Sequence, residues 1–319
     1  MQIDRLFLSV GVMKAGTTWI HRMLSQHPQI RSTPVKEIHY FSHLHLPGHA
    51  DLAPVRKLAT ATPLTAIDPK KNKPMAVRSR LLWTAKFLAE PTDDRWYANL
   101  FAPCPQDAYC ADFSNLYCLM GAPGWHHVRR ICGKVRVIFT MRDPRTRLWS
   151  HARFSALKTG RTAEIATWTP ETFETLVRTP SIWMNGEYGS AVRRLRESLS
   201  EEELKISFFE DIHRDPARWL REVEDHLGIR RHDYSTDGLT KRFAQSVERP
   251  MPDWLPELFQ SDLERVVAEL AEQGIEAPRE WLSPLPTKPA EHESPSRVSS
   301  SAWEAMSKAR RTVLSAFRA

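Results

Sequence analysis

The residues most suited to binding an anion stand in one short turn near the start of the chain. Residues 11–18 read Gly-Val-Met-Lys-Ala-Gly-Thr-Thr, after an apolar run and before a helical pattern. A glycine-containing turn between a strand and a helix N-terminus presents backbone N–H groups to an anion. Lys14 adds a positive charge, and Thr17 and Thr18 add hydroxyl donors. The turn is therefore predicted to bind a phosphate group.

This turn differs from the nucleotide triphosphatase loop GxxxxGK[ST] at the decisive position. Thr17, not a lysine, follows Gly16, and Lys14 lies inside the turn. A nucleotide-dependent kinase is the alternative interpretation, with Asp143 as a metal-binding carboxylate. Asp143 stands between Arg142 and Pro144, which favours a turn over a magnesium ligand.

The elements that must position these residues alternate between strand and helix. Apolar or β-branched runs predict strands at 6–12, 108–111, 135–141 and 205–209. Helical patterns cover 17–25, 145–157, 187–199 and 216–227. This alternation predicts an α/β fold with a central parallel β-sheet flanked by helices.

Two loops of this predicted sheet carry the candidate ligands. If one ligand contacts both Lys14 and Arg142, strands 6–12 and 135–141 must be neighbours. The two residues must then lie within about 15 Å of each other, the reach of one nucleotide.

Composition limits the partners and the compartment. The chain has 319 residues and a net charge of +7, which favours anionic partners. The positive charge is spread along the chain, so nucleic acid is not expected as a partner. The four cysteines fit no zinc pattern and are expected to be reduced. The N-terminus lacks a signal-peptide pattern, and no apolar run is long enough to span a membrane, so the protein is expected to be cytoplasmic.

Irregular segments suggest the domain boundaries. Residues 1–279 are expected to form one domain, within which 43–94 is a substrate-binding insertion with one helix near 78–88. Residues 280–300 are rich in Pro, Ser and Glu and read as a linker. Residues 302–317 could form a tail helix, and no oligomeric state is predicted.

With these motifs in place, the chain resembles the sulfotransferases that use 3′-phosphoadenosine-5′-phosphosulfate (PAPS). It is most similar to the carbohydrate branch, with the heparan sulfate sulfotransferases and their bacterial relatives. The resemblance implies a P-loop-NTPase-like sulfotransferase fold. It rests first on Lys14-Ala15-Gly16-Thr17-Thr18, which in that family grips the 5′-phosphosulfate. Residues 142–151, Arg-Asp-Pro-Arg-Thr-Arg-Leu-Trp-Ser-His, match a second family motif, in which Arg142 and Ser150 would bind the 3′-phosphate.

A third match, Lys36-Glu37-Ile38-His39-Tyr40-Phe41, implies Glu37 as the general base with His39 assisting it. On the residues alone, Glu37 could instead be a surface glutamate paired with Lys36, and His39 a core or acceptor-binding histidine. Arg147 could be an extra phosphate contact or a solvated helix residue, and the second interpretation is favoured. Weaker matches include Phe209-Glu210-Asp211. The stretch 112–117 departs from the family because it lacks a proline after Ser114, which puts a heparan-like acceptor in doubt.

The resemblance therefore implies transfer of a sulfuryl group from PAPS to a hydroxyl or amine, with a carbohydrate or other small molecule as acceptor. Adenosine 3′,5′-bisphosphate would be the product. Lys14 would act on the leaving phosphate oxygen, and no metal is expected. Besides the kinase, a non-catalytic polyanion-binding protein of the same fold is an alternative. Glu37 discriminates against it, since a pure anion binder has no use for a carboxylate there.

Overall fold

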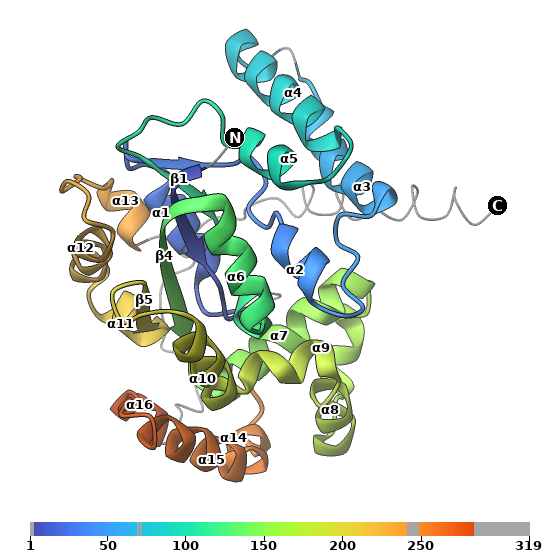
Figure 1. Cartoon of the computed structure of the whole chain (residues 1–319). Helices are drawn as coiled ribbons and strands as arrows, with labels where there is room; N and C mark the ends of the chain where they lie inside the picture. Colours follow the sequence, from blue (N-terminus) through green and yellow to red (C-terminus); the bar gives the residue numbers. More distant parts are fainter. Residues whose placement is uncertain (1–2, 69, 71, 241–248, 284–319) are drawn as a thin grey trace.

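A five-stranded parallel β-sheet with strand order β2-β3-β1-β4-β5 forms the centre of the protein (Figure 1). The computed structural model describes residues 3–68, 70, 72–240 and 249–283. The strands are β1 (Ile3–Ser9), β2 (Ile30–Ser32), β3 (Tyr109–Asp112), β4 (Cys132–Met141) and β5 (Leu204–Phe208).

The helices follow and separate these strands along the chain. The α-helices are α1 (Thr17–Leu24), α2 (Tyr40–His45), α3 (Pro54–Thr65), α4 (Pro74–Leu88), α5 (Asp94–Asn99), α6 (Ala122–Ile131), α7 (Pro144–Thr159), α8 (Pro170–Val177), α9 (Pro180–Trp183), α10 (Tyr188–Ser198), α11 (Phe209–Arg214), α12 (Pro216–Leu227), α13 (Thr236–Thr240), α14 (Trp254–Leu258), α15 (Gln260–Ala271) and α16 (Arg279–Leu282). Short 3₁₀ turns are η1 (Tyr117–Leu119), η2 (Thr162–Thr167) and η3 (Met184–Gly186).

The predicted adjacency of the first and third predicted strands is confirmed. β1 pairs with β4 in parallel, from Ile3 opposite Cys132 to Ser9 opposite Ile138. Residues 10–12, predicted as strand, lie beyond β1 but stay hydrogen-bonded to β4: Val12 N donates to the Thr140 carbonyl at 2.8 Å. The loops that follow both strands therefore leave the same edge of the sheet, where ligands of parallel sheets bind.

Successive side chains of the central strands fill two separate cores, as the pleat of a strand requires. Leu6 and Leu8 of β1 pack on the side covered by α6 and α10, while Phe7 packs on the side covered by α1 and α12. Both cores contain fully buried tryptophans, Trp125 of α6 and Trp219 among them. The sheet thus has helices on both faces, as predicted.

The structure corrects the sequence predictions at short and proline-containing elements. Strand β2 has three residues and was not predicted. The segment 43–94 holds two long helices rather than one, because α3 forms despite Pro63 inside it, a residue that ordinarily ends a helix. The four predicted helices α1, α7, α10 and α12 are found with ends within two residues of those predicted.

The C-terminal boundary also lies later than composition suggested. Residue 280 was predicted to begin a linker, yet α16 inserts Trp281 fully into the core against Tyr188 and Phe208. The Trp281 carbonyl accepts a 2.6 Å hydrogen bond from Arg145. The predicted tail helix, 302–317, lies outside the described residues. In the described part of the chain, no helix is both long and apolar enough to cross a membrane, and all four cysteines are free thiols.

Replacing Trp281 tests whether α16 is integral to the domain. Trp281→Ala is expected to lower the free energy of unfolding by about 3–5 kcal/mol, because it leaves a large cavity in a packed core. Leu282→Ala is the matched control, since Leu282 is the next residue on the same helix and is 64% exposed. Urea denaturation of both variants measures the difference. Equal midpoints for the two would mean that α16 is dispensable.

Candidate functional site

The turn between β1 and α1 is shaped by two glycines that no other residue could replace without rearrangement. Gly16, the N-cap of α1, has φ 80°, and a Cβ atom there would lie 2.9 Å from the ring of Phe209. Gly11 has φ 141°, and a Cβ atom there would lie 2.8 Å from the Asn115 carbonyl oxygen. These approaches leave room for backbone only, so the turn stays close to both neighbouring loops.

Lys14 occupies an unusual backbone conformation within this turn. Its φ of 74° is left-handed, and among the described residues only Lys14 and His39 combine a positive φ with a side chain. Such conformations cost free energy and concentrate at functional sites. The Lys14 Nζ lies 4.5 Å from the centre of the Phe154 ring. Burial, and then the nearby charge of Arg142, lower the pKa of Lys14 to about 8.

Arg142 joins the turn to the loop after β4. Its Nη1 donates to the Lys14 carbonyl at 3.0 Å, and its Nε donates to the Thr146 hydroxyl at 3.0 Å. The guanidinium also lies over the Phe209 ring, 4.4 Å from its centre. Lys14 and Arg142 thus meet the requirement that one ligand be able to reach both.

Helix α7 carries the rest of the second predicted motif. Ser150 follows Thr146 by four positions, so the two share a face of the helix, and Ser150 is 7% exposed. Asp143 caps the helix by accepting hydrogen bonds from the backbone N–H groups of Arg145 and Thr146. It also forms a buried ion pair with Arg145 at 2.8 Å. The predicted role of Asp143 as a turn residue is therefore confirmed.

Arg147 was predicted to be solvated, and that prediction is wrong. Its side chain is 1% exposed, and its Nη1 donates to His151 Nδ1 at 3.3 Å. Burial, and then the charges of Arg147 and Lys14, lower the pKa of His151 to about 3. A neutral histidine held beside buried cations indicates a strongly positive environment, which suits an anionic ligand.

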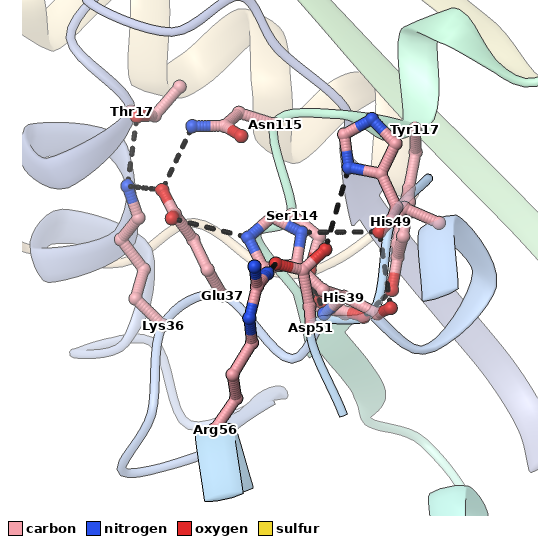
Figure 2. A network of polar contacts seen from close by, with 12 residues as sticks. Thr17, Lys36, Glu37, His39, His49, Asp51, Arg56, Ser114, Asn115 and Tyr117 are labelled. Atoms are coloured by element: carbon pink, nitrogen blue, oxygen red, sulfur yellow. Dashed lines mark hydrogen bonds and ion pairs between the residues drawn. The ribbon is translucent and has the colours of Figure 1, made fainter. Parts of the chain in front are cut away.

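Glu37 lies in a second cluster that reaches the same turn (Figure 2). Lys36 Nζ donates to the Thr17 hydroxyl at 3.0 Å and pairs with Glu37 Oε1 at 3.0 Å. Asn115 donates to the same carboxylate oxygen at 3.0 Å, and His39 Nε2 lies 3.4 Å from Glu37 Oε2. Burial alone would raise the pKa of Glu37, but Lys36 and His39 outweigh it and hold that pKa well below its usual range.

His39 is fixed by the loop that follows β3. Its backbone N–H donates to the Ser114 hydroxyl at 2.9 Å, and Ser114 in turn donates to the buried Asp112 at 2.6 Å. Tyr97 and Tyr117 donate to the other oxygen of Asp112. Burial opposes protonation of His39, but the hydrogen bond and charge of Glu37 raise its pKa. The stretch 112–117 thus anchors His39 although it lacks the expected proline.

The segment 43–94 contributes polar groups beside His39. Asp51 pairs with Arg56 at 3.2 Å, and its charge is among the influences that raise the pKa of His39 (Figure 2). His49 Nδ1 lies 3.6 Å from Asp51. These side chains precede or begin α3, so this segment reaches the candidate site at its start.

The structure brings most of the predicted residues into contact. The turn from Lys14 to Thr18 lies against Arg142, and Lys36 links Thr17 to Glu37 and through it to His39. Ala15 is buried, and its N–H donates within the turn to the Val12 carbonyl. Ser150 is placed by its position on α7.

Sequence reasoning missed three contributors: Lys36 as a bridge, Asn115 as a donor to Glu37, and Phe209 under Arg142. All three stand inside stretches that were already singled out by motif. In the described residues, no group of three or more His, Cys, Asp or Glu side chains could hold a metal ion.

Comparisons with known proteins agree with this geometry. The family model described as "Sulfotransferase family" matches residues 7–233. No curated protein sequence matches the chain. A sulfotransferase from Alicyclobacillus acidocaldarius has the same fold at a TM-score of 0.58 and 21% identity, covering 88% of this chain and 99% of that one.

More distant solved structures include the sulfotransferase domain of the Synechococcus PCC 7002 olefin synthase, with a TM-score of 0.44, 17% identity and coverage of 86% and 95% of the two chains. A sulfotransferase from Mycobacterium avium has a TM-score of 0.41 and 15% identity, with 83% and 77% covered. These two are too distant in structure to carry an argument. The family match extends over most of the chain and over the loops that form the candidate site, so the protein belongs to the sulfotransferase family.

Proposed function

We propose that this protein transfers the sulfuryl group of PAPS to a hydroxyl or amine of an acceptor, most specifically a carbohydrate. One observation carries the proposal: a cluster of buried cations around the β1–α1 turn is linked, through Lys36, to the carboxylate of Glu37. The cations suit a donor with several negative charges, and the carboxylate suits an acceptor that must lose a proton.

The cationic residues fit PAPS in number and placement. Lys14, Arg142 and Arg147 are all partly or fully buried, and the pKa values of all three are lowered chiefly by burial. Cations under this constraint gain from an anion that neutralises them. Arg142 and Ser150 would hold the 3′-phosphate, and residues 14–18 the 5′-phosphosulfate. The N-terminus of α1 adds its partial positive charge.

PAPS supplies an activated sulfuryl group, which passes to the acceptor as the sulfur–oxygen bond to phosphate breaks. In such a transfer the protein contributes positioning and charge stabilisation. Lys14 would stabilise the negative charge that develops on the leaving phosphate oxygen. Thr17 and Thr18 would fix the phosphate at the helix end through their hydroxyls.

Glu37 would take the proton of the acceptor. With Lys36 and His39 beside it, Glu37 is a weak base, because both hold its pKa low. Lys36 also contacts Thr17, so it is placed to turn toward the anionic donor. That movement would release Glu37 and bring its pKa closer to its ordinary value, where a base works better. His39, whose pKa is raised, would remain the hydrogen-bond partner that orients Glu37.

The acceptor is proposed to be a carbohydrate on two grounds. The stretch 36–41 resembles the carbohydrate branch of the family, and the start of segment 43–94 places Asp51 and Arg56 beside His39. Charged side chains that can donate and accept hydrogen bonds suit a hydroxyl-rich molecule. A screen of sugar, phenol, amine and lipid acceptors with labelled PAPS identifies the class directly.

The two alternatives are less compatible with the contacts. A kinase would need Asp143 for magnesium, but both oxygens of Asp143 are engaged by Arg145 and the start of α7. A non-catalytic polyanion binder would be weakened by a carboxylate near the anion site, yet Glu37 lies one side chain away from Thr17.

Donor binding should depend on Arg142 and not on a metal. Calorimetry is expected to detect adenosine 3′,5′-bisphosphate binding that EDTA does not alter. Arg142→Ala should weaken it about 10- to 100-fold, the effect of losing charged hydrogen bonds. Arg218→Ala, which alters an arginine with a 77% exposed side chain on α12, is the control. Binding of ATP with magnesium, without any response to the bisphosphate, would favour the kinase.

Lys14 should give donor binding a characteristic pH dependence. Its pKa of about 8 means that it loses its charge as pH rises through that value, so bisphosphate affinity should fall by up to about five-fold between pH 8 and 9. Lys14→Arg stays charged throughout and should flatten this dependence. In a separate measurement, Lys14→Ala should lower turnover by roughly 10²–10³ while leaving the fold intact. Identical affinity profiles for wild type and Lys14→Arg would argue against a titrating Lys14.

Glu37 should affect the rate and spare the donor. Glu37→Gln is expected to lower the single-turnover rate by roughly 10²–10⁴, with donor affinity changed little, because the residue acts on the acceptor. Lys36→Met removes the charge that depresses the pKa of Glu37, so the acid limb of the kcat/KM profile should move to higher pH. The acceptor is whichever compound the screen finds active. An unchanged rate in Glu37→Gln would remove it from the mechanism and make His39 the next candidate base.

A further inference from the structure

Exposed apolar side chains gather on the helical hairpin formed by α3 and α4. Of the nine large apolar residues that are exposed in the described part of the chain, six lie between residues 54 and 88. They are Leu58, Ile67, Met75, Leu81, Leu82 and Leu88. Met75 is 69% exposed and Leu82 56%. Figure 1 shows α4 at the periphery of the molecule, at the opposite end from α16.

The hairpin is also strongly basic. No acidic residue occurs between Asp68 and Glu90, whereas that stretch contains Lys70, Lys71, Lys73, Arg78, Arg80 and Lys86. Lys73 and Arg78 are exposed. Arg80 and Lys86 donate to backbone carbonyls, which carry no net charge to neutralise them. Basic and apolar groups therefore share one surface.

The two faces of α4 explain why the apolar side chains stay exposed. Trp83 and Phe87 are buried and stack on each other, and Trp83 Nε1 donates to the Leu100 carbonyl at 2.9 Å. This face attaches the helix to the body of the protein. On the other side, Met75, Arg78 and Leu82 follow one another at helical spacing and form a mixed apolar and basic stripe.

We propose that the α3–α4 hairpin docks on an anionic lipid surface. Helices that lie at a membrane interface combine apolar side chains, which enter the headgroup region, with Lys and Arg, which meet anionic lipids. The apolar side chains project from a peripheral hairpin, so a protein partner would have to offer a groove for them, whereas a lipid headgroup region receives them directly. The positive charge of the hairpin then favours an anionic lipid surface over another basic segment of this chain or a second copy of it.

A second copy of the chain and the C-terminal residues 302–319 are both basic, so neither is expected to bind to this basic surface. A second copy of the chain would bring like charges together across a two-fold axis. Residues 302–319 have Lys308, Arg310, Arg311 and Arg318 against one acidic residue, so they too would be repelled. An anionic membrane is attracted instead.

Vesicle binding by the full-length chain tests the proposal. Co-sedimentation with vesicles of phosphatidylcholine and phosphatidylglycerol is expected to exceed binding to phosphatidylcholine alone by about ten-fold or more, and to weaken as salt is added. Lys73→Ser combined with Arg78→Ser should lower the partition coefficient by roughly five-fold per residue. Met75→Ser combined with Leu82→Ser should lower it by about ten-fold or more.

Matched controls keep these outcomes specific. Leu282→Ser changes a residue that is 64% exposed on α16, and Arg218→Ser changes an exposed arginine on α12, and neither should alter binding. Thermal unfolding of every variant checks the fold without reference to any donor. Equal binding to both kinds of vesicle, or hairpin variants that bind like wild type, would overturn the proposal. The proposal would also be overturned if the chain did not bind vesicles and instead formed a concentration-dependent dimer that the Met75→Ser and Leu82→Ser variant could not form.

Discussion

The contact between the Arg142 guanidinium and the Lys14 carbonyl holds the candidate site together, and much of the architecture serves to permit it. It requires β1 beside β4, so that the loops after the two strands leave the same edge of the sheet. It requires Gly16, because any larger residue would displace Phe209, the ring on which Arg142 rests. It also fixes α7, since Arg142 binds Thr146 in the first turn of that helix.

The sequence predicted the parts of the fold that follow strong local patterns. The β-branched run of β4 and the turn with Lys14 and two glycines predicted both loops of the candidate site, and strand pairing brings these loops together as expected. Tertiary packing decided the rest. Arg147 reads as a solvated residue on a charged helix, yet it lies buried beneath Tyr188 and Gly186. Trp281 lies in a proline-rich stretch that resembles a linker in the sequence. Its helix forms there because the Trp281 side chain packs into the hydrophobic core.

Lys36 shows a further limit of reading residues one at a time. From the sequence, pairing with Lys36 was the bland interpretation of Glu37, set against a catalytic role. In the structure the ion pair exists, but it lies between the β1–α1 turn and the loop after β3. A salt bridge in such a place does not exclude a functional carboxylate. It keeps that carboxylate ionised, and in the proposed function it would also restrain the carboxylate until the anionic donor competes for Lys36.

Two features of the candidate site cost free energy. Lys14 and His39 adopt left-handed backbone conformations that cost on the order of 1–3 kcal/mol each. Three cations are also held under partial or full burial, which is the main cause that lowers the pKa values of Lys14, Arg142 and Arg147, and for Lys14 the charge of Arg142 adds to it. The surrounding core must supply this free energy when the protein folds. An anion that bridges the turn and α7 would relieve the charge repulsion, so binding and stability are coupled, as they are for any ligand that binds only the folded state. Under the proposed function, a donor with phosphate groups at both loops would neutralise these cations and stabilise the folded protein.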